Sequence, residues 1–401
     1  MISKSSNNAL KIINLSVLLQ QQRYIVAISY LFYLQNGLTL SDFLLFQSIF
    51  YFTGLIAEIP AGYIADIFSR KKVLIFSYLL FMFRIILWIV APNYWTILTG
   101  EILYGLSKAF YRGTSDSYIY DYLKSTDSTD YMLNKYGKFN FFMSCGSAIS
   151  CLVGAWLYKY IGFSLLLGIE LFCNSTAVFS LLFLPNLPQT QKSRSFKEHI
   201  TTIFDVVKDT IKNSALRTYM LCGAVLSGIT SVFVWNFQPM MKNFAVPVYM
   251  FGIIYFINHI LRAVSSFNAH KFLKKIPLEQ TGLLSWILYL ISFVLMFNVM
   301  EAGNKATCIF VLLFVCVAIG VQMIFNVGNV ARIHKLISLN TRATISSVNF
   351  MLTGLFSGLF LMVFKYVAQN NSIRTALLFF GFIFLFLILL IRKMYAKSVQ
   401  S

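Results

Sequence analysis

Charge is what this sequence has little of. Only 12% of its 401 residues are Asp, Glu, Lys or Arg, against about 25% in a typical soluble domain. Residues 73–91, 165–184, 307–327 and 376–391 form nearly uninterrupted apolar runs. A surface helix of a soluble protein shows a polar stripe at a period of 3.6 residues, and these runs show almost none. The composition therefore excludes a soluble protein and indicates an integral membrane protein.

Enzyme motifs are also missing. The sequence has no Gly-rich phosphate loop, no nucleophile elbow and no metal-ligand cluster, and its loops are too short for an ATPase domain. The six cysteines form no CxxC pair and lie within apolar runs, so we expect buried thiols and neither disulfides nor a metal site. We therefore expect no enzyme activity, no cofactor and no bound metal, and any transport has to be secondary.

Apolar segments that could cross a bilayer fill most of the chain. A membrane-spanning helix needs about 20 apolar residues, and the sequence predicts an all-α membrane protein with twelve transmembrane helices. Polar residues at 20–23 interrupt the first of them. The expected spans are 11–34, 42–65, 73–91, 94–120, 137–159, 162–184, 215–238, 249–270, 279–300, 306–330, 344–367 and 375–394.

The basic residues between these spans are unevenly distributed. Of the 33 Lys and Arg residues, 23 lie on one side of the predicted membrane and five on the other. The positive-inside rule then places both termini and the central loop in the cytoplasm. The net charge of +19 is spread over these loops, so nucleic acid is not an expected partner. The remaining five basic residues lie within spans: Arg23, Arg84, Lys108, Arg112 and Arg262.

The longest predicted loop divides the chain into two sets of six spans. It covers residues 185–214 and contains several of the cytoplasmic basic residues. We expect an N-terminal half at 1–184, a cytoplasmic central loop at 185–214 and a C-terminal half at 215–401. Transporters with two parallel halves have this layout and bind substrate near the midplane between them.

The loop after the second span carries the clearest motif. Residues 62–73 read GYIADIFSRKKV. Within this run, Gly62, Asp66, Arg70 and Lys71 resemble the signature between spans 2 and 3 of the major facilitator superfamily. Further runs, at 58–60 (EIP), 113–123 (GTSDSYIYDYL) and 342–344 (RAT), resemble a bacterial branch of drug or antibiotic exporters. The resemblance implies a major facilitator fold in a bacterial cytoplasmic membrane.

The resemblance also implies a cytoplasmic gate. Asp66 would lie near the N-terminus of span 11, close to Arg342, where the helix dipole favours a carboxylate. Arg70 and Asp121 would be its relay partners. Asp66 and Arg70 are four residues apart and could pair directly if the helix continued for one more turn. The other interpretation is that Arg70 and Lys71 only follow the positive-inside rule.

Span 4 contains four ionisable residues on one face. On a helical wheel, Glu101, Lys108, Arg112 and Asp116 fall within about 80° of one another. Each would cost about 2.5–3.5 kcal/mol at mid-membrane, so this face must contact water or partners. Span 4 lines the central cavity in the superfamily, which favours a substrate-binding wall. A structural ladder of salt bridges is the alternative.

Proton coupling requires a titratable group inside the membrane. Glu101 and Glu170 are the deepest carboxylates in spans 4 and 6, and buried carboxylates can act as proton carriers. His259 is a further candidate, although a hydrogen-bonded structural histidine is the simpler interpretation. The usual exporter pattern of an arginine before a glycine in span 4 and a Gly-Pro pair in span 5 is absent.

The second half is mostly neutral in its spans. Gln238, Gln322 and Asn326 are the polar residues expected in the substrate cavity, together with Arg262 and, from the first half, Arg23. One charged wall and one amide- and aromatic-lined wall suit a small amphipathic organic or peptide-like compound, anionic or zwitterionic. We therefore expect a monomeric secondary transporter in the lipid bilayer, with protons and this compound as partners. Proton-coupled export and uptake symport of a nutrient or metal chelate both remain open.

Overall fold

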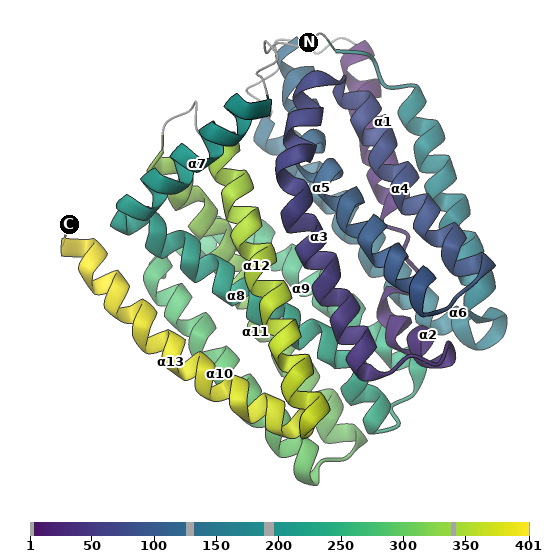
Figure 1. The fold of residues 1–401 in the computed structure, drawn as a ribbon, viewed down its shortest axis with the longest axis vertical. Coiled ribbons are helices and arrows are strands. Elements are labelled where there is room, and N and C mark those ends of the chain that lie inside the picture. Colours follow the sequence, from purple (N-terminus) through teal and green to yellow (C-terminus); the bar gives the residue numbers. More distant parts are fainter. Residues whose placement is uncertain (1–3, 126–131, 188–195, 338–341, 401) are drawn as a thin grey trace. The chain divides into compact units, whose positions relative to one another are not determined.

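The computed structural model describes residues 4–125, 132–187, 196–337 and 342–400, and all regular secondary structure in these ranges is helical (Figure 1). The chain forms two compact units. The first consists of Met1–Leu38, Phe52–His199 and Phe251–His259, and the second of Thr39–Tyr51, Ile200–Met250 and Ile260–Ser401.

The first unit is built around an apolar core that includes Val17, Tyr78, Tyr118 and Leu181. The first two helices of the chain are short, and α6 is long. Within the unit α1 and α4 pack on α6, and α4 packs on α5. The elements are α1 (Lys4–Gln20), the 3-10 helix η1 (Val26–Ile28), α2 (Ser29–Gln35), α3 (Leu40–Ile67), α4 (Arg70–Val90), α5 (Tyr94–Ser125) and α6 (Met132–Leu182), although residues 40–51 of α3 belong to the second unit.

The first expected span, 11–34, is not one continuous helix. Helix α1 ends at Gln20, residues 21–25 are turn or irregular backbone, and η1 and α2 continue to Gln35. Figure 1 shows α1 and α2 as separate purple helices. The polar residues that interrupt the apolar run therefore mark a real interruption of the helix. We call residues 21–25 the break.

Helix α6 contains two of the expected spans. The backbone at Gly162 has φ 69° and ψ −177°, a conformation that is essentially restricted to glycine. The helix is therefore interrupted there, at the position where the sequence separates the span ending at residue 159 from the one beginning at 162. We refer to the part after Gly162 as the second half of α6.

The second unit contains the remaining long helices. Helix α8 packs on α11 and α12, and α10 packs on α11 and α13. Aromatic rings pack together in its core, where Trp286 and Phe384 are stacked with centroids 4.5 Å apart. Its helices are α8 (Ser214–Asn243), α9 (Val248–Leu273), α10 (Leu278–Ala302), α11 (Lys305–Lys335), α12 (Arg342–Asn370) and α13 (Ile373–Gln400), although residues 251–259 of α9 belong to the first unit.

In the described part of the chain, eight helices are long and apolar enough to cross a membrane: α3, α4, α6, α8, α9, α10, α11 and α12. Four other expected spans are not among these eight as separate helices. They are the broken first span, the charge-rich α5, the second half of the double-length α6, and α13, whose apolar stretch at Ile373–Leu389 is shorter.

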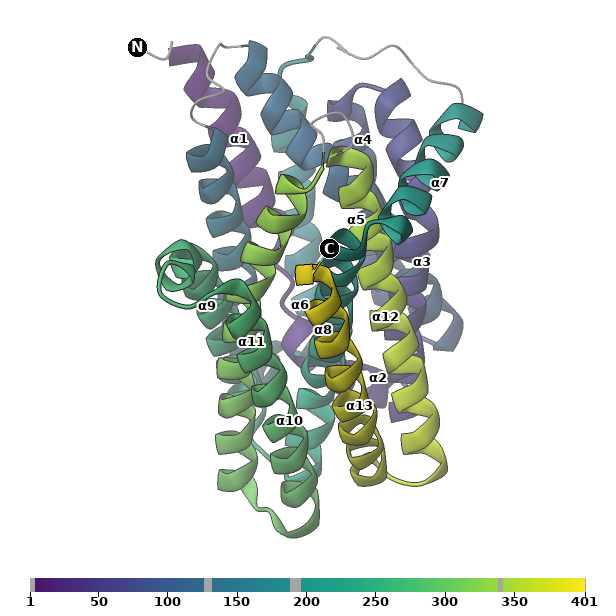
Figure 2. The ribbon, with the colours of Figure 1, turned by 90° about the vertical axis from the view of Figure 1, so that its left-hand side faces the viewer.

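The central loop is partly helical, which the sequence analysis did not predict. Residues Phe196–Lys212 form α7, which is inclined to α12 rather than parallel to it (Figure 2). Ile203 and Val206 are buried, whereas Phe204 and Lys208 are exposed. Apolar residues recur in this segment at helical spacing, so the signal for an amphipathic helix was present.

Candidate functional site

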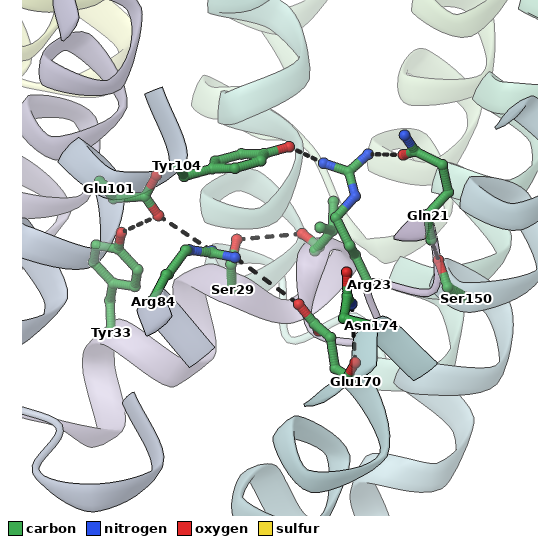
Figure 3. Close-up of polar contacts among 11 residues, drawn as sticks. Gln21, Arg23, Ser29, Tyr33, Arg84, Glu101, Tyr104, Ser150, Glu170 and Asn174 are labelled. Atoms are coloured by element: carbon green, nitrogen blue, oxygen red, sulfur yellow. Dashed lines mark hydrogen bonds and ion pairs between the residues drawn. The ribbon is translucent and has the colours of Figure 1, made fainter. Parts of the chain in front are cut away.

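Three buried charges of the first unit meet at Arg84. Arg84 lies on α4, Glu101 on α5 and Glu170 on the second half of α6. Nη2 of Arg84 is 3.4 Å from Oε1 of Glu101, and Nη1 is 3.9 Å from Oε1 of Glu170 (Figure 3). The three side chains are 5%, 3% and 0% exposed. One guanidinium is therefore shared by two buried carboxylates, and we call these three residues the triad.

Aromatic rings surround the guanidinium. The Cζ atom of Arg84 lies 3.8 Å from the ring centroid of Trp88, 4.9 Å from that of Tyr104 and 5.2 Å from that of Phe81. Trp88 packs so closely on Gly100 that a Cβ there would come within 2.1 Å of its Nε1. Cation–π contacts of this kind hold a guanidinium most strongly where water is excluded. The position of Arg84 is therefore fixed by packing as well as by charge.

The broken first span contacts both carboxylates. The hydroxyl of Tyr33, on α2, donates to Oε1 of Glu101 at 3.0 Å. The backbone N–H groups of Tyr24 and Ile25, in the break, face the carboxylate of Glu170. Hydrogen bonds to ionised groups are stronger than neutral ones. The first span therefore stabilises one carboxylate from its break and the other from the short helix that follows.

Small residues of α6 accommodate the break. Ser150 donates from Oγ to the carbonyl of Gln21 at 3.1 Å. At Gly154 a Cβ would come within 1.8 Å of the carbonyl oxygen of Tyr24, so only glycine fits there. Irregular backbone at membrane depth is tolerated only where protein or a water-filled cavity covers it. Helix α6 supplies that cover in this unit.

Two further cations converge on Tyr104. The guanidinium of Arg23, in the break, donates to the Tyr104 hydroxyl and to Oε1 of Gln21 (Figure 3). Its Cζ lies 5.6 Å from the Tyr104 ring centroid, and Nζ of Lys108 lies 5.5 Å from the same centroid. Lys108 is also 5.5 Å from the ring of Tyr111. Both cations are partly exposed.

The predicted charged face of α5 has an uneven environment. Helix α5 runs without interruption from Tyr94 to Ser125, so the predicted angular positions hold. Glu101 is buried, Lys108 and Asp116 are partly buried, and Arg112 is exposed. Glu101 therefore belongs to the triad, whereas the others lie where a ligand or water can reach them. Their role in substrate binding stays a prediction.

The motif after the second span contains a helix boundary. Helix α3 ends at Ile67 and α4 begins at Arg70, so the helix does not continue through the motif, which was the condition of the predicted Asp66–Arg70 pairing. Nε of Arg70 lies 2.5 Å from Oδ2 of Asp121 on α5. Gly62 and Asp66 lie in the last two turns of α3, and both are partly exposed.

Lys71 makes a contact that the sequence did not suggest. Its Nζ donates to the carbonyls of Leu182 and Leu184 at 2.6 and 2.8 Å. The last carbonyls of a helix lack partners within that helix, so Lys71 caps the end of α6. Arg342 begins α12, and its side chain lies outside the described residues. The gating role of this motif stays a prediction.

The predicted polar stripe of the second unit is only partly available to a ligand. Gln238 and Gln322 are buried, and Asn326 is partly buried. Asn329, on the same face of α11, donates to the carbonyl of Tyr219 on α8 at 3.0 Å. That residue therefore joins two helices and has a structural role.

Arg262 has an unusual environment. It lies on the part of α9 that belongs to the second unit, it is partly exposed, and its ionisable neighbours are the phenols of Tyr51 and Tyr289. The hydroxyl of Tyr289 is also 2.6 Å from Oγ1 of Thr230. His259 lies one turn earlier on α9, in the first unit, and is partly buried.

Sequence reasoning missed the centre of the site. Arg84 was counted among the basic residues within spans but was given no role. Its signal was its position, because a lone arginine in the apolar run at 73–91 must find a partner. The contributions of Tyr33, Tyr104 and Trp88 had no such signal, because uncharged aromatic residues are abundant in this chain.

Comparisons with known proteins agree with this architecture. The sequence pattern of the Major Facilitator Superfamily matches residues 12–361. No match was found among curated proteins. Solved structures with similar folds include the nucleoside transporter NupG, with 16% identity, a TM-score of 0.74 and coverage of 98% of this chain and 99% of that one.

Two other transporter structures are similar. A POT family transporter in complex with 5-aminolevulinic acid has 12% identity and a TM-score of 0.77, and the match covers 97% of this chain and 96% of that one. A bacterial homolog of the human lysosomal transporter Spinster, inward-facing and occupied, has 12% identity and a TM-score of 0.70, with coverage of 100% and 97%. These identities are low, so the matches show the fold alone, with its twelve-helix arrangement.

Proposed function

Because the chain belongs to the Major Facilitator Superfamily and is a secondary transporter rather than an enzyme, we propose that it moves a small amphipathic organic or peptide-like compound across the cytoplasmic membrane in exchange for protons. We propose that the direction is export and that both termini lie in the cytoplasm. The runs at 58–60 and 113–123, which resemble those of bacterial exporters, support this direction.

The triad is the observation that carries proton coupling. Charge-assisted hydrogen bonds between a guanidinium and a carboxylate are usually about 2.7–2.9 Å long. Arg84 is farther than this from both partners, at 3.4 Å from Glu101 and 3.9 Å from Glu170. A small movement toward one carboxylate would tighten that pair and loosen the other. The loosened carboxylate would then bind a proton more readily, which gives two alternative charge states.

The first span connects these charge states to movement. Tyr33 holds Glu101 through α2, and the amides of the break face Glu170. Protonation of Glu101 weakens the hydrogen bond from Tyr33, and protonation of Glu170 weakens its attraction to the amides of the break, because a neutral carboxylic acid is a poorer acceptor than a carboxylate. We propose that the two parts of the first span respond to the protonation of the triad, and that alternating access follows from this response.

The proposed substrate class is inferred from the charged and polar side chains within each unit. The first unit offers the cations Arg23 and Lys108 beside the Tyr104 ring. The second unit offers neutral hydroxyl groups, such as Ser231, which donates to Ser357 at 3.1 Å. Cations beside an aromatic ring suit a compound with both charged and apolar parts.

The sign of a pH change tests this proposal. The purified protein is placed in liposomes that contain a trapped pH dye, and a panel of aromatic amino acids, dipeptides and phenylacetate is added outside. If a compound enters in exchange for protons, the lumen becomes more alkaline. If compound and protons enter together, the lumen acidifies, which would replace proton-coupled export by uptake symport.

A matched variant is the control for this assay. Glu301 is also paired with an arginine, Arg374, but their side chains are 52% and 39% exposed at the end of α10. Glu301→Gln should keep the pH response, and Glu101→Gln should lose it. A pH response of equal size in liposomes without protein, or in both variants, would argue against transport through the triad.

A further inference from the structure

Lys108 is a partly buried cation among other cations. Its charged neighbours are Arg23, Arg84 and Arg112, all of the same sign. Its own contacts are with the rings of Tyr104 and Tyr111, and it forms no ion pair with any residue that the structure describes. A charge in the membrane interior normally faces a partner of opposite sign. The described part of the chain supplies none for Lys108.

Arg23 is in the same situation. It donates to two neutral groups, the Tyr104 hydroxyl and the Gln21 side chain, and within the described ranges it has no carboxylate partner. Its Nε is buried without a hydrogen-bond acceptor. The nearby carboxylates, Glu101 and Glu170, contact Arg84. Among the residues that the structure describes, neither Arg23 nor Lys108 therefore has a counter-ion of its own.

The charges of this region leave positive charge in excess. Arg23, Arg84, Lys108 and Arg112 contribute four positive charges, and Glu101 and Glu170 contribute two negative ones. A ligand that brings negative charge to Arg23 and Lys108 would reduce this excess. Both side chains are partly exposed and lie against the same ring, at 5.6 and 5.5 Å from its centroid, so one anionic group could contact both.

From these contacts we infer that Arg23, in the break, and Lys108, on α5, bind the anionic group of the transported compound, a carboxylate or a phosphate. The inference rests on the proposed transport function and names the substrate class of that site. Arg23 directly precedes Tyr24 and Ile25, whose amides face Glu170. The break therefore contributes Arg23 to the anion site and also faces one carboxylate of the triad with its amides.

Binding can be tested without transport. The full-length protein in detergent is titrated with phenylacetate, with phenyl phosphate, and with phenethylamine and benzyl alcohol as cationic and neutral counterparts of similar size, and the unfolding temperature is followed. We expect saturable stabilisation by at least one of the two anions and none by the other two probes. The anion that binds more tightly separates a carboxylate site from a phosphate site.

Variants locate the site. Lys108→Gln and Arg23→Gln should each weaken anion binding by about tenfold or more, since each removes a charge-assisted contact. Lys108→Arg, which keeps the charge, should retain binding. Lys159→Gln is the matched control. Lys159 on α6 also lies near a tyrosine ring, 6.0 Å from the centroid of Tyr160, but its side chain is exposed. This variant should bind the anion like the wild type.

A second measurement separates a binding role from a structural one. Without ligand, Lys108→Gln should raise the unfolding temperature, because it removes repulsion among like charges; a structural lysine would lower it. Equal anion binding by the wild type and Lys108→Gln, or stabilisation by phenethylamine instead, would overturn the inference. Anion binding at Lys108 without any transport would instead count against the proposed function alone.

Discussion

Among single substitutions, we expect removal of Arg84 to destabilise the protein most, because two buried carboxylates pair with this arginine. Removing one partner of a buried ion pair costs about 3–5 kcal/mol, since the remaining charge is left uncompensated. We expect Arg84→Met to destabilise the protein by about this amount. Denaturation of the purified variant in detergent measures the loss.

Two comparisons give this prediction its control. Arg374→Met removes an arginine from an exposed pair with Glu301, and exposed pairs contribute only about 0–1 kcal/mol. The triple variant Arg84→Met/Glu101→Gln/Glu170→Gln removes all three charges and should regain much of the lost stability. If Arg84→Met were as stable as Arg374→Met, the triad would not be the buried charge centre described above.

For single residues, the sequence predicts which charges are costly to place inside a membrane better than it predicts which residues they pair with. Hydropathy shows that Arg84, Glu101 and Glu170 are expensive inside a membrane. Their meeting point depends on how α4, α5 and the second half of α6 pack, and no spacing within one segment encodes that. Within single helices the prediction was better, since the face shared by Glu101 and Lys108 follows from helical periodicity alone.

Among the elements, the break in the first span depends on close packing with α6. A Cβ at Gly154 would lie 1.8 Å from the carbonyl oxygen of Tyr24, so Gly154→Ala has to displace the break. Overpacking of this kind typically costs about 1–3 kcal/mol. We expect Gly154→Ala to lower the unfolding temperature and to impair transport in the liposome pH assay, because the break contacts Glu170 and contains Arg23.

Gly168, on the second half of the same helix, is the control. A Cβ at Gly168 meets nothing within 4 Å, and alanine is favoured over glycine within a helix by roughly 0.5–1 kcal/mol. Gly168→Ala should therefore be neutral or slightly stabilising and should transport normally. Similar losses of stability and transport in the two variants would contradict this prediction, because they would show that the effect does not depend on the close approach at Gly154.

Most elements follow from hydropathy, and the exceptions have physical reasons. The separation of two spans near Gly162 was visible because polar and small residues interrupt the apolar run there. The break at 21–25 was visible as a polar interruption, but its geometry depends on Gly154 and Ser150 of another helix. Helix α7 was missed because its segment follows a proline-containing loop, although its apolar residues have helical spacing.

Over the whole molecule, the distribution of basic residues predicts the orientation in the membrane. With 23 of the 33 Lys and Arg residues on one side, both termini should be cytoplasmic. A reporter fused after Ser401 should therefore be cytoplasmic, and one inserted at Asn93, between α4 and α5, should be external. A cytoplasmic signal at Asn93 would contradict this orientation.

The most direct test of proton coupling through the triad separates driven transport from exchange. Using a compound identified by the liposome pH assay, Glu101→Gln and the wild type are compared in two modes: accumulation driven by an imposed pH difference, and exchange of labelled for unlabelled compound at equal pH. We predict that Glu101→Gln loses accumulation and retains exchange, because the neutral amide keeps the shape of the site but cannot carry a proton. Full pH-driven accumulation by Glu101→Gln would contradict the proposal that this carboxylate couples proton flow to transport.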